Sequence, residues 1–482
     1  MKKKGVQYSL IISLFLVALI TTFVVVNLIR IPEPEGVYAM KDLSPASLSS
    51  DNGYYMVMAF SYPPEVDITA SDVSAEIRKI SDPGLLSLNA KEIRKKAKQH
   101  DDLHSKLVIR KKEAIFQKFS EHFDKIASYR DILSGFSNAN PVLMQRYSLL
   151  LQAGKIEDFS LPSVSYPLPD YTAIMTAANF YTASQILIAL GGRWEEGVTG
   201  ILKQIAFYRT LSANSRQPAN KILSLETLKN SFRALAFIMN HENCPRNVFA
   251  LILTGLTPLR DPEIGLRNMI VFNFLMTVQG MDEIIRSTGP PFQEIGVIQA
   301  GFFPSTTDWL NFLAKFRIFL DRNRTTQYFL SETNKILQFE KTPPFLWKQD
   351  LTDLTPPEPT KRLFWWFSNP IGKALIAVGY DNYQKQIFEK HQTKALFDLV
   401  RICAEFHLKC TEARSPTDLY KGLEHFSAID PFSGNPYLYD EKKQILYSVG
   451  ENRIDDGGNG TPDNRGMPPD LIISCRFFKR LK

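Results

Sequence analysis

Residues 8–29 constrain this chain most, because they form an apolar run without a single charged side chain. A helix of this length spans roughly 33 Å, which matches a bilayer hydrocarbon core of about 30 Å. Three lysines, Lys2, Lys3 and Lys4, precede the run. Positive charge favours the cytoplasmic side of a membrane. The sequence therefore predicts a cytoplasmic tail at residues 1–7, a transmembrane helix at 8–29, and all later residues outside the cytoplasm.

The apolar run is a signal anchor or a cleaved signal peptide. It is longer than the apolar core of a secretory signal, and no Ala-x-Ala-like site follows it. The segment that does follow, Arg30-Ile-Pro-Glu33, is a poor cleavage site. We therefore expect a retained anchor and a single-pass protein of the cytoplasmic (inner) membrane, with its bulk periplasmic or otherwise extracytoplasmic; cleavage is the alternative.

Composition allows a sizeable core but names no partner. The 482 residues are 44% hydrophobic and 22% charged, with a formal net charge of +7. A chain of this size is expected to form two or three domains. Much of the positive charge lies in residues 91–130. This stretch is either a basic arm for anionic lipid or nucleic acid, or a solvated helix. Interspersed acids favour the helix, and an exported chain rarely meets nucleic acid, so no nucleic-acid partner is expected.

The body of the chain shows helical periodicity. Residues 30–69 are predicted as a linker with a short strand at 54–60, and residues 70–345 as a helical body. Three apolar stripes at helical spacing are evident: Ile174, Ala177, Tyr181, Ser184 and Ile188; Trp194, Val198, Ile201, Ile205 and Tyr208; Leu225, Leu228, Phe232, Leu235 and Met239. Gly191-Gly192 separates the first two and predicts an antiparallel helical hairpin.

Further helices are predicted to start at Asp261-Pro262 and at Asp308. Residues 346–429 are expected to form a Pro-rich loop and a last long helix over about 371–408. Residues 430–482 change character and predict a small β and loop module, with strand-like runs at 444–449 and 471–475. No fixed repeat is evident. The expected fold is mainly α: a transmembrane helix, an irregular bundle or solenoid-like body, and the C-terminal module.

The C-terminal module carries the most specific motifs of the chain. They are Asp430-Pro-Phe-Ser-Gly-Asn-Pro-Tyr-Leu-Tyr439, Leu446-Tyr-Ser-Val-Gly450, Asp455-Asp-Gly-Gly458 and Pro469-Asp-Leu-Ile472. This series resembles the calcium-loop region of the major pseudopilins of type II secretion, over about the last 50 residues. The departures are Asn452 in place of an aspartate, a longer loop, and an anchor that lacks the prepilin start, so the chain is not itself a pilin.

The resemblance implies a structural calcium ion in this loop. Carboxylates on a glycine-rich loop can surround a hard cation with oxygen ligands. The expected ligands are Asp455, Asp456 and Asp470, with Asn452 and Asp463 secondary. The alternative is a solvated turn without metal, in which Asp and Gly serve turn geometry.

A wider set of motifs resembles uncharacterised bacterial membrane-anchored envelope proteins with a helical body. The pieces are Leu149-Leu-Leu151, Tyr166-Pro-Leu-Pro-Asp-Tyr171, Asn369-Pro-Ile-Gly-Lys373 and the Asp430 motif, in this order. The resemblance implies location and architecture but no activity.

Cys403, His407 and Cys410 have a spacing compatible with zinc ligands on one helix face. Three ligands on one helix make a poor tetrahedron, so packing of small buried cysteines is favoured. A disulfide between Cys403 and Cys410 is not expected, because seven residues of helix separate their Cα atoms by roughly 10 Å. Whether Cys244 and Cys475 meet stays open.

Two other segments have a functional and a structural interpretation. Phe364-Trp-Trp-Phe367 is a partner-binding patch or core packing, and Glu195-Glu196 is an acid pair or the first turn of a helix. Packing and the helix turn are favoured. The sequence has no Gly-x-Ser-x-Gly, His-Glu-x-x-His, phosphate-loop or dinucleotide fingerprint.

These observations favour a non-catalytic interaction platform of the bacterial envelope with an envelope protein as its partner. The alternatives are an envelope hydrolase acting on cell wall or lipid, and an accessory component of a secretion system. A polar cleft with two acids of raised pKa would favour the hydrolase.

Overall fold

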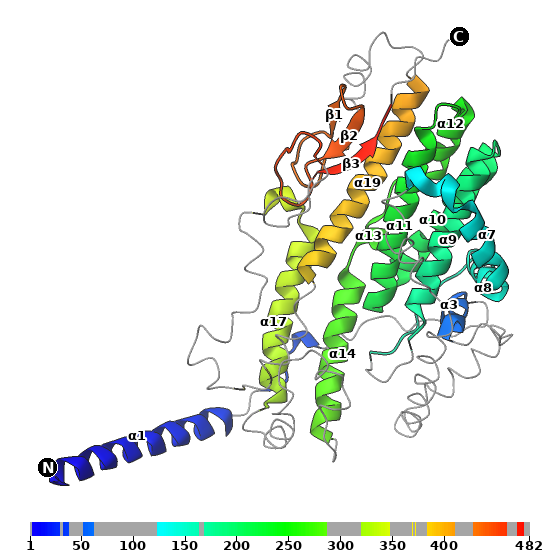
Figure 1. Ribbon diagram of the computed structural model, residues 1–482. Coiled ribbons are helices and arrows are strands. Elements are labelled where there is room, and N and C mark those ends of the chain that lie inside the picture. The colour runs from blue at the N-terminus through cyan, green and yellow to red at the C-terminus, as the bar shows by residue number, and fades with distance from the viewer. Residues whose placement is uncertain are drawn as a thin grey trace.

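The computed structural model describes residues 2–28, 32–37, 52–61, 123–162, 168–286, 320–347, 369, 372, 383–409, 428–459 and 470–476. These residues are mainly helical and include one small sheet, as the sequence predicts (Figure 1). The α-helices are α1 (Lys2–Leu28), α3 (Tyr54–Met58), α7 (Arg130–Ala139), α8 (Pro141–Leu150), α9 (Tyr171–Leu190), α10 (Trp194–Asn214), α11 (Pro218–Met239), α12 (Arg246–Gly255), α13 (Asp261–Ile264), α14 (Arg267–Arg286), α17 (Arg322–Lys341) and α19 (Tyr383–Lys409). The 3-10 helices are η1 (Ala59–Ser61), η3 (Phe123–Tyr129) and η5 (Pro344–Leu346). The strands are β1 (Leu438–Asp440), β2 (Ile445–Ser448) and β3 (Leu471–Ser474).

The predicted hairpin of α9 and α10 is confirmed. Asp170 caps α9 by accepting a hydrogen bond from Ala173 N at 2.9 Å. At the other end Gly192 takes φ +94°, a conformation that glycine adopts without steric cost and that lets the chain reverse. Glu195 and Glu196 lie in the first turn of α10, where acids favour the helix dipole.

The core is centred on α11, which packs against α9, α10 and α19. All five residues of the predicted α11 stripe are buried, and so are four of the five in α10. The α9 stripe was partly misplaced. Tyr181, Ser184 and Ile188 are half-buried, whereas Phe180, Ala183 and Ile186 are buried. The reason is that α9 contacts α8 as well as α10 and α11, so its buried face is wider than one stripe.

The segment predicted as a strand at 54–60 is helical instead. It forms α3 and η1, and Tyr54, Tyr55, Val57 and Met58 are all buried. Gly53 is the N-cap of α3, and the preceding Asn52 accepts a hydrogen bond at its Oδ1 from Tyr54 N at 3.0 Å. Packing in the core, with only Met56 of α3 half-buried, therefore overrides the strand preference of aromatic and β-branched residues, which is a weak prior.

The sheet has the antiparallel order β1-β2-β3. Leu446 in the central strand pairs with Tyr439 on one side and Ile473 on the other. The predicted strand runs at 444–449 and 471–475 are confirmed as β2 and β3, whereas β1 was not predicted. One face of the sheet packs on α19, at the end of the molecule farthest from α1 (Figure 1).

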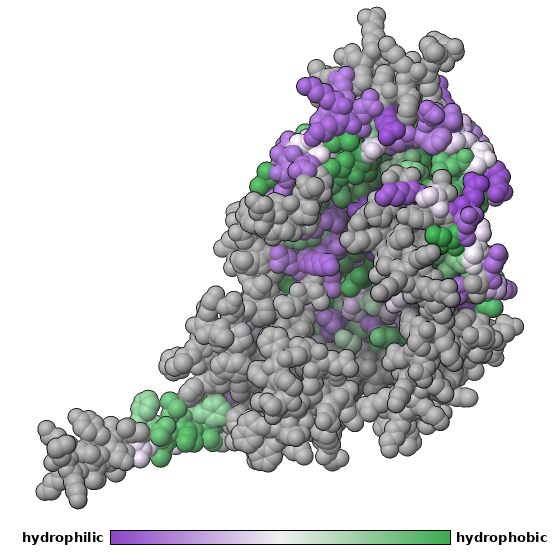
Figure 2. Space-filling view, in the orientation of Figure 1, coloured by the Kyte–Doolittle hydropathy of each residue, from purple (hydrophilic) through white to green (hydrophobic). Residues whose placement is uncertain are grey.

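Two apolar helices, α9 and α1, differ in how far they are buried by the rest of the protein. Helix α9 is long and apolar enough to cross a membrane by length and composition, but half of its apolar window is buried in the core. Helix α1 points away from the body (Figure 1), and its described apolar residues form an uncovered green stretch in the space-filling view (Figure 2). Phe15, Val17 and Ile20 are 65%, 60% and 60% exposed.

The end of α1 is attached to α17. Asn27 is buried, and its Oδ1 accepts a hydrogen bond from Asn369 N at 2.8 Å. Arg324 donates to the Val26 carbonyl at 3.1 Å. Asn369 also donates to Thr325 Oγ1, so the α1 end and the first turn of α17 share one hydrogen-bonded group.

Helix α13 begins at Asp261 with Arg260 as its N-cap, one residue before the predicted cap. The last long helix is α19, described over Tyr383–Lys409. Several predictions lie outside the described residues: the basic stretch over 91–122, the helix at Asp308, the aromatic cluster at 364–367, Cys410 and Asp463.

Candidate functional site

The described members of the predicted calcium set lie on or beside the loop that joins β2 to β3, but their carboxylates do not form a group of described residues close enough together to hold one ion. Asp470 is buried at the start of β3, and its carboxylate accepts backbone hydrogen bonds from Gly458 at 2.7 Å, Asn459 at 3.3 Å and Asp456 at 3.5 Å. Burial raises the pKa of the Asp470 carboxyl, and the three backbone amides oppose that effect. Gly458 has φ +68°, which brings its amide to this carboxylate. Asp470 thus closes the loop on itself.

The other described members of the predicted set lie on the outer part of the same loop. Asp455 is exposed and accepts a hydrogen bond from Tyr447 OH at 3.1 Å. Asp456 is exposed and accepts one from Asn452 Nδ2 at 2.7 Å. Each carboxylate therefore has a donor from the chain. These contacts suit a hydrogen-bonded turn as well as a cation loop, so calcium binding stays a prediction.

Asp430, in the most specific motif, has a role that sequence reasoning missed. Its buried carboxylate accepts hydrogen bonds from Phe432 N, Ser433 Oγ, Ser448 Oγ and Val449 N at 2.7 to 3.2 Å. Burial raises the pKa of this carboxyl, and the four donors oppose the rise. Asp430 therefore fastens the turn at 430–437 to β2 and serves the architecture of the sheet.

The same motif joins the sheet to α19. Tyr437 OH donates to Asp398 Oδ2 at 3.0 Å, and Lys394 donates to the same oxygen at 2.7 Å. The buried Phe432 ring stacks on Phe388 of α19, with centroids 6.3 Å apart. The conspicuous turn residues of the motif therefore position the sheet on the helix.

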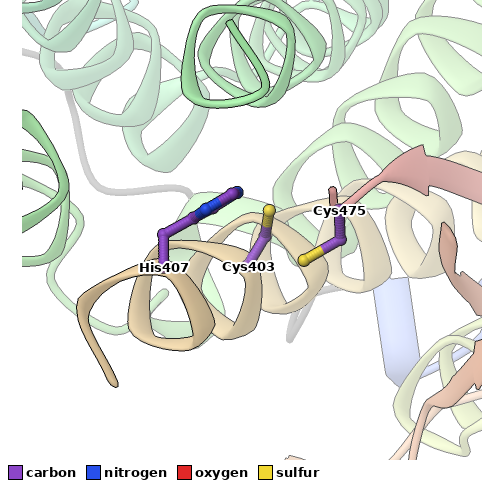
Figure 3. A group of neighbouring side chains, drawn as sticks. All are labelled: Cys403, His407 and Cys475. Atoms are coloured by element: carbon purple, nitrogen blue, oxygen red, sulfur yellow. The ribbon is translucent and has the colours of Figure 1, made fainter. Parts of the chain in front are cut away.

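A different group of side chains converges on one point beneath β3. Cys403 and His407 stand one turn apart on α19, and Cys475 directly follows β3 (Figure 3). One ligand atom from each lies within 4.8 Å of the others, and all three residues are buried. Among the described residues, these three form a group of His, Cys, Asp or Glu side chains that lie close enough together to hold one metal ion.

The surroundings hold this group in place. Burial alone would raise the pKa of the Cys403 thiol, but the hydrogen bond with Cys475 and the adjacent His407 outweigh it and lower this pKa to about 6. The thiolate is the form of cysteine that binds metals. The His407 ring stacks on Phe249, with centroids 4.8 Å apart and an interplanar angle of 12°.

Asn240, at the end of α11, positions the backbone on both sides of Cys475. Its Nδ2 donates to the Ser474 carbonyl, and its Oδ1 accepts a hydrogen bond from Arg476 N at 2.8 Å. Asn240 is itself buried and also donates to the Ala236 carbonyl at 2.7 Å. Three elements, α11, α19 and β3, therefore determine where the Cys475 sulfur lies.

The local spacing indicates Cys410 as the third member of this group and favours packing over metal. The structure brings Cys475 to Cys403 and His407, a contact across 72 positions that no local spacing reveals. The only signal in the sequence was that Cys475 closes a strand-like run. Cys244 is also buried, but it is not part of the group.

A second buried polar cluster ties helices together. Arg209 forms an ion pair with Glu263 at 2.8 Å, and both side chains are buried. Lys221 is only 1% exposed, and its Nζ donates to the carbonyls of Ser212, Pro262 and Glu263 at 2.9 to 3.2 Å. Burial lowers the pKa of Lys221 to about 7. The Arg209 and Lys221 side chains both donate to acceptors on other segments, so this cluster stabilises the packing of the helices.

A pocket of about 490 Å³ lies beside α17. Its polar lining consists of Arg267, Asn334, Gln338 and Lys341, which are two cations and two amides. An acid pair for general acid–base hydrolysis is not among the residues that line it.

Comparison with known proteins finds no matching family model, no matching curated protein and no matching solved structure.

Proposed function

We propose that this chain is a single-pass membrane protein whose body lies outside the cytoplasm and acts as a non-catalytic interaction platform of the bacterial envelope. The exposure of apolar side chains on α1 is the main support for a membrane anchor. A helix that leaves Phe15, Val17 and Ile20 more than half exposed is costly in water, at about 25 cal/mol for each Å² of apolar surface. Lipid removes that cost.

The attachment of α1 to α17 supports the same proposal. The helix ends in a buried contact at Asn27, so it is an extension of the body and not a loose tail. The sheet lies at the far end of the molecule (Figure 1). A bilayer around α1 would leave the sheet distant from the membrane, where it is open to a partner.

Exposed apolar side chains on the distal part support the platform. Phe345 and Leu346 in η5 are 39% and 55% exposed, and Ile429 and Ile454 about half exposed. Both other segments contact η5, since Phe345 N donates to the Pro431 carbonyl at 3.2 Å and Arg453 Nη1 donates to the Pro344 carbonyl at 3.3 Å. Clustered apolar surface of this kind marks interaction sites. We refer to Phe345, Leu346, Ile429 and Ile454 as the distal apolar patch.

The anchor is tested by charge. The double substitution Val17→Arg and Ile20→Arg should release the full chain into the soluble fraction, because each arginine at the centre of a transmembrane helix costs about 2.5 to 3.5 kcal/mol. Ile454→Arg is the matched control at an exposed apolar position of the body, and it should leave the protein in the membrane. Retention of the double variant would contradict the anchor.

The orientation is tested by a reporter enzyme, active only outside the cytoplasm, fused after Lys482. Activity is expected, because the lysines before the apolar run favour the cytoplasmic side. An inactive fusion that is present at full length in the membrane would overturn the orientation.

The platform is tested by a photo-crosslinking residue placed at Leu346 in cells, with the same residue at Leu168 as control. Both positions are more than half exposed, but Leu168 lies outside the distal apolar patch. A discrete adduct from position 346 and none from position 168 is expected. The same adducts from both positions, or none from either, would contradict the patch as a binding surface.

A further inference from the structure

The buried group of Cys403, His407 and Cys475 has the composition of a metal site and not of ordinary packing. Two sulfurs and one imidazole nitrogen point toward a common centre from two elements (Figure 3). We propose that these three side chains bind one zinc ion, which joins α19 to the residue after β3. The proposal does not depend on the membrane anchor or on the distal apolar patch.

The ligand chemistry selects the ion. Thiolates and imidazole are soft and borderline ligands, which suit zinc, whereas calcium and magnesium require oxygen. No carboxylate belongs to this group among the described residues. The Cys403 and His407 spacing of four residues places both ligands on one helix face. Cys475 approaches from the opposite side and removes the objection that three ligands on one helix make a poor tetrahedron.

The distances are close to those of a zinc site. Zinc stands about 2.3 Å from sulfur and about 2.0 Å from nitrogen, so neighbouring ligand atoms in a tetrahedron are separated by roughly 3.5 to 3.8 Å. The three atoms here lie within 4.8 Å of one another. A contraction of about 1 Å, within reach of side-chain rotation, therefore completes three of the four positions. Among the described residues no fourth ligand belongs to the group.

Burial and charge favour the same ion. The three side chains are 0 to 2% exposed. Two thiolates and one neutral imidazole carry a charge of −2, and a divalent cation makes the whole group neutral. Burying a neutral complex avoids the desolvation cost of an isolated buried charge, which is several kcal/mol for each ion.

The residues around the ligands position them, and Cys403 Sγ itself donates to the Ser474 carbonyl at 3.8 Å. Phe249 holds the plane of the His407 ring by stacking. Asn240 holds the backbone of Ser474 and Arg476, the two neighbours of Cys475. Such outer contacts orient the ligands in metal sites.

The test uses the full chain purified in detergent without chelator, with metal content measured by mass spectrometry and thiols counted after unfolding. One zinc per chain is expected in the wild type and none in Cys475→Ser or His407→Gln. Cys244→Ser is the matched control, because Cys244 is buried but lies outside the group, and it should keep one zinc. Loss of zinc from a control as complete as from Cys475→Ser would overturn the assignment of these three ligands.

A second measurement does not depend on how the variants fold. The wild type, stripped of metal, is titrated with cobalt(II), and a thiolate-to-cobalt absorption band that zinc then abolishes is expected. Zinc should also raise the melting temperature, because a ligand of the native state stabilises it. Absence of both responses with all thiols free would refute the site. A disulfide between Cys403 and Cys475 in freshly isolated protein, or one copper in place of zinc, would also refute it.

Discussion

His391 makes the folded protein sensitive to acid. It is 6% exposed in α19, between the rings of Trp347 and Phe432. Burial, together with the charges of Lys390 and Lys394, lowers the pKa of His391 from 6.5 to about 3. The native state therefore keeps this imidazole neutral over a range in which the unfolded chain protonates it.

The sign and size of the effect follow from that difference. Since the folded pKa is the lower one, the contribution of His391 to stability is fully present above about pH 6.5 and is lost as the pH falls toward 3. Between about pH 7.5 and about pH 5 the linkage relation gives a loss of about 2 kcal/mol from this one group. The value applies with little screening because the ring is buried.

The substitution His391→Phe keeps an aromatic ring between the same neighbours and removes the titration. Urea unfolding of the full chain in detergent, followed by helical circular dichroism, should show that the variant loses about 2 kcal/mol less than the wild type over this pH range. Phe388→Leu, in the same core, is the control and should lower the free energy of unfolding equally at both pH values. Identical pH slopes for wild type and His391→Phe would refute a buried neutral histidine.

Three further predictions concern other parts of the fold. Arg209→Met should lower the free energy of unfolding by about 3 kcal/mol, because it removes the buried ion-pair partner of Glu263. The double variant with Glu263→Leu should recover part of that loss when both are unfolded by denaturant. Gly197→Ala should cost about 1 to 3 kcal/mol because its Cβ would meet the α9 backbone, whereas Gly135→Ala, with open space around it, should be neutral or stabilising in the same assay. Calcium should raise the melting temperature of the wild type but not of Asp456→Ala, and a calcium titration without a thermal shift would reduce the loop to a turn.

Local patterns of the sequence predict the elements whose signals are local. The α9–α10 hairpin follows from periodicity and a two-glycine turn, and β2 and β3 follow from short apolar runs between turn residues. The prediction of a strand at 54–60 was wrong, because packing in the core favours a helix for these residues despite their strand preference.

The candidate site could be predicted only in part, because its residues come from segments that are distant in the sequence. Cys403 and His407 show ligand spacing because one helix carries both, but Cys475 reaches them through the packing of β3 on α19. Likewise, the motif around Asp430 is visible in the sequence. The role of Asp430 as an acceptor of hydrogen bonds from Ser448 and Val449 depends on where β2 packs. Contacts between distant segments leave no periodicity to detect.

The hydrogen bond between Asn27 and Asn369 has a consequence for the order of assembly. It spans 342 positions of the chain. Closing an unstructured loop of that length costs about 5 kcal/mol in chain entropy, so the contact forms only after the intervening helices have already shortened the path. Because ribosomes make α1 first, the Asn27 side chain waits for this partner until at least residue 369 has been synthesised. The apolar helix is therefore made first, and the body docks onto its end only after residue 369 has been synthesised.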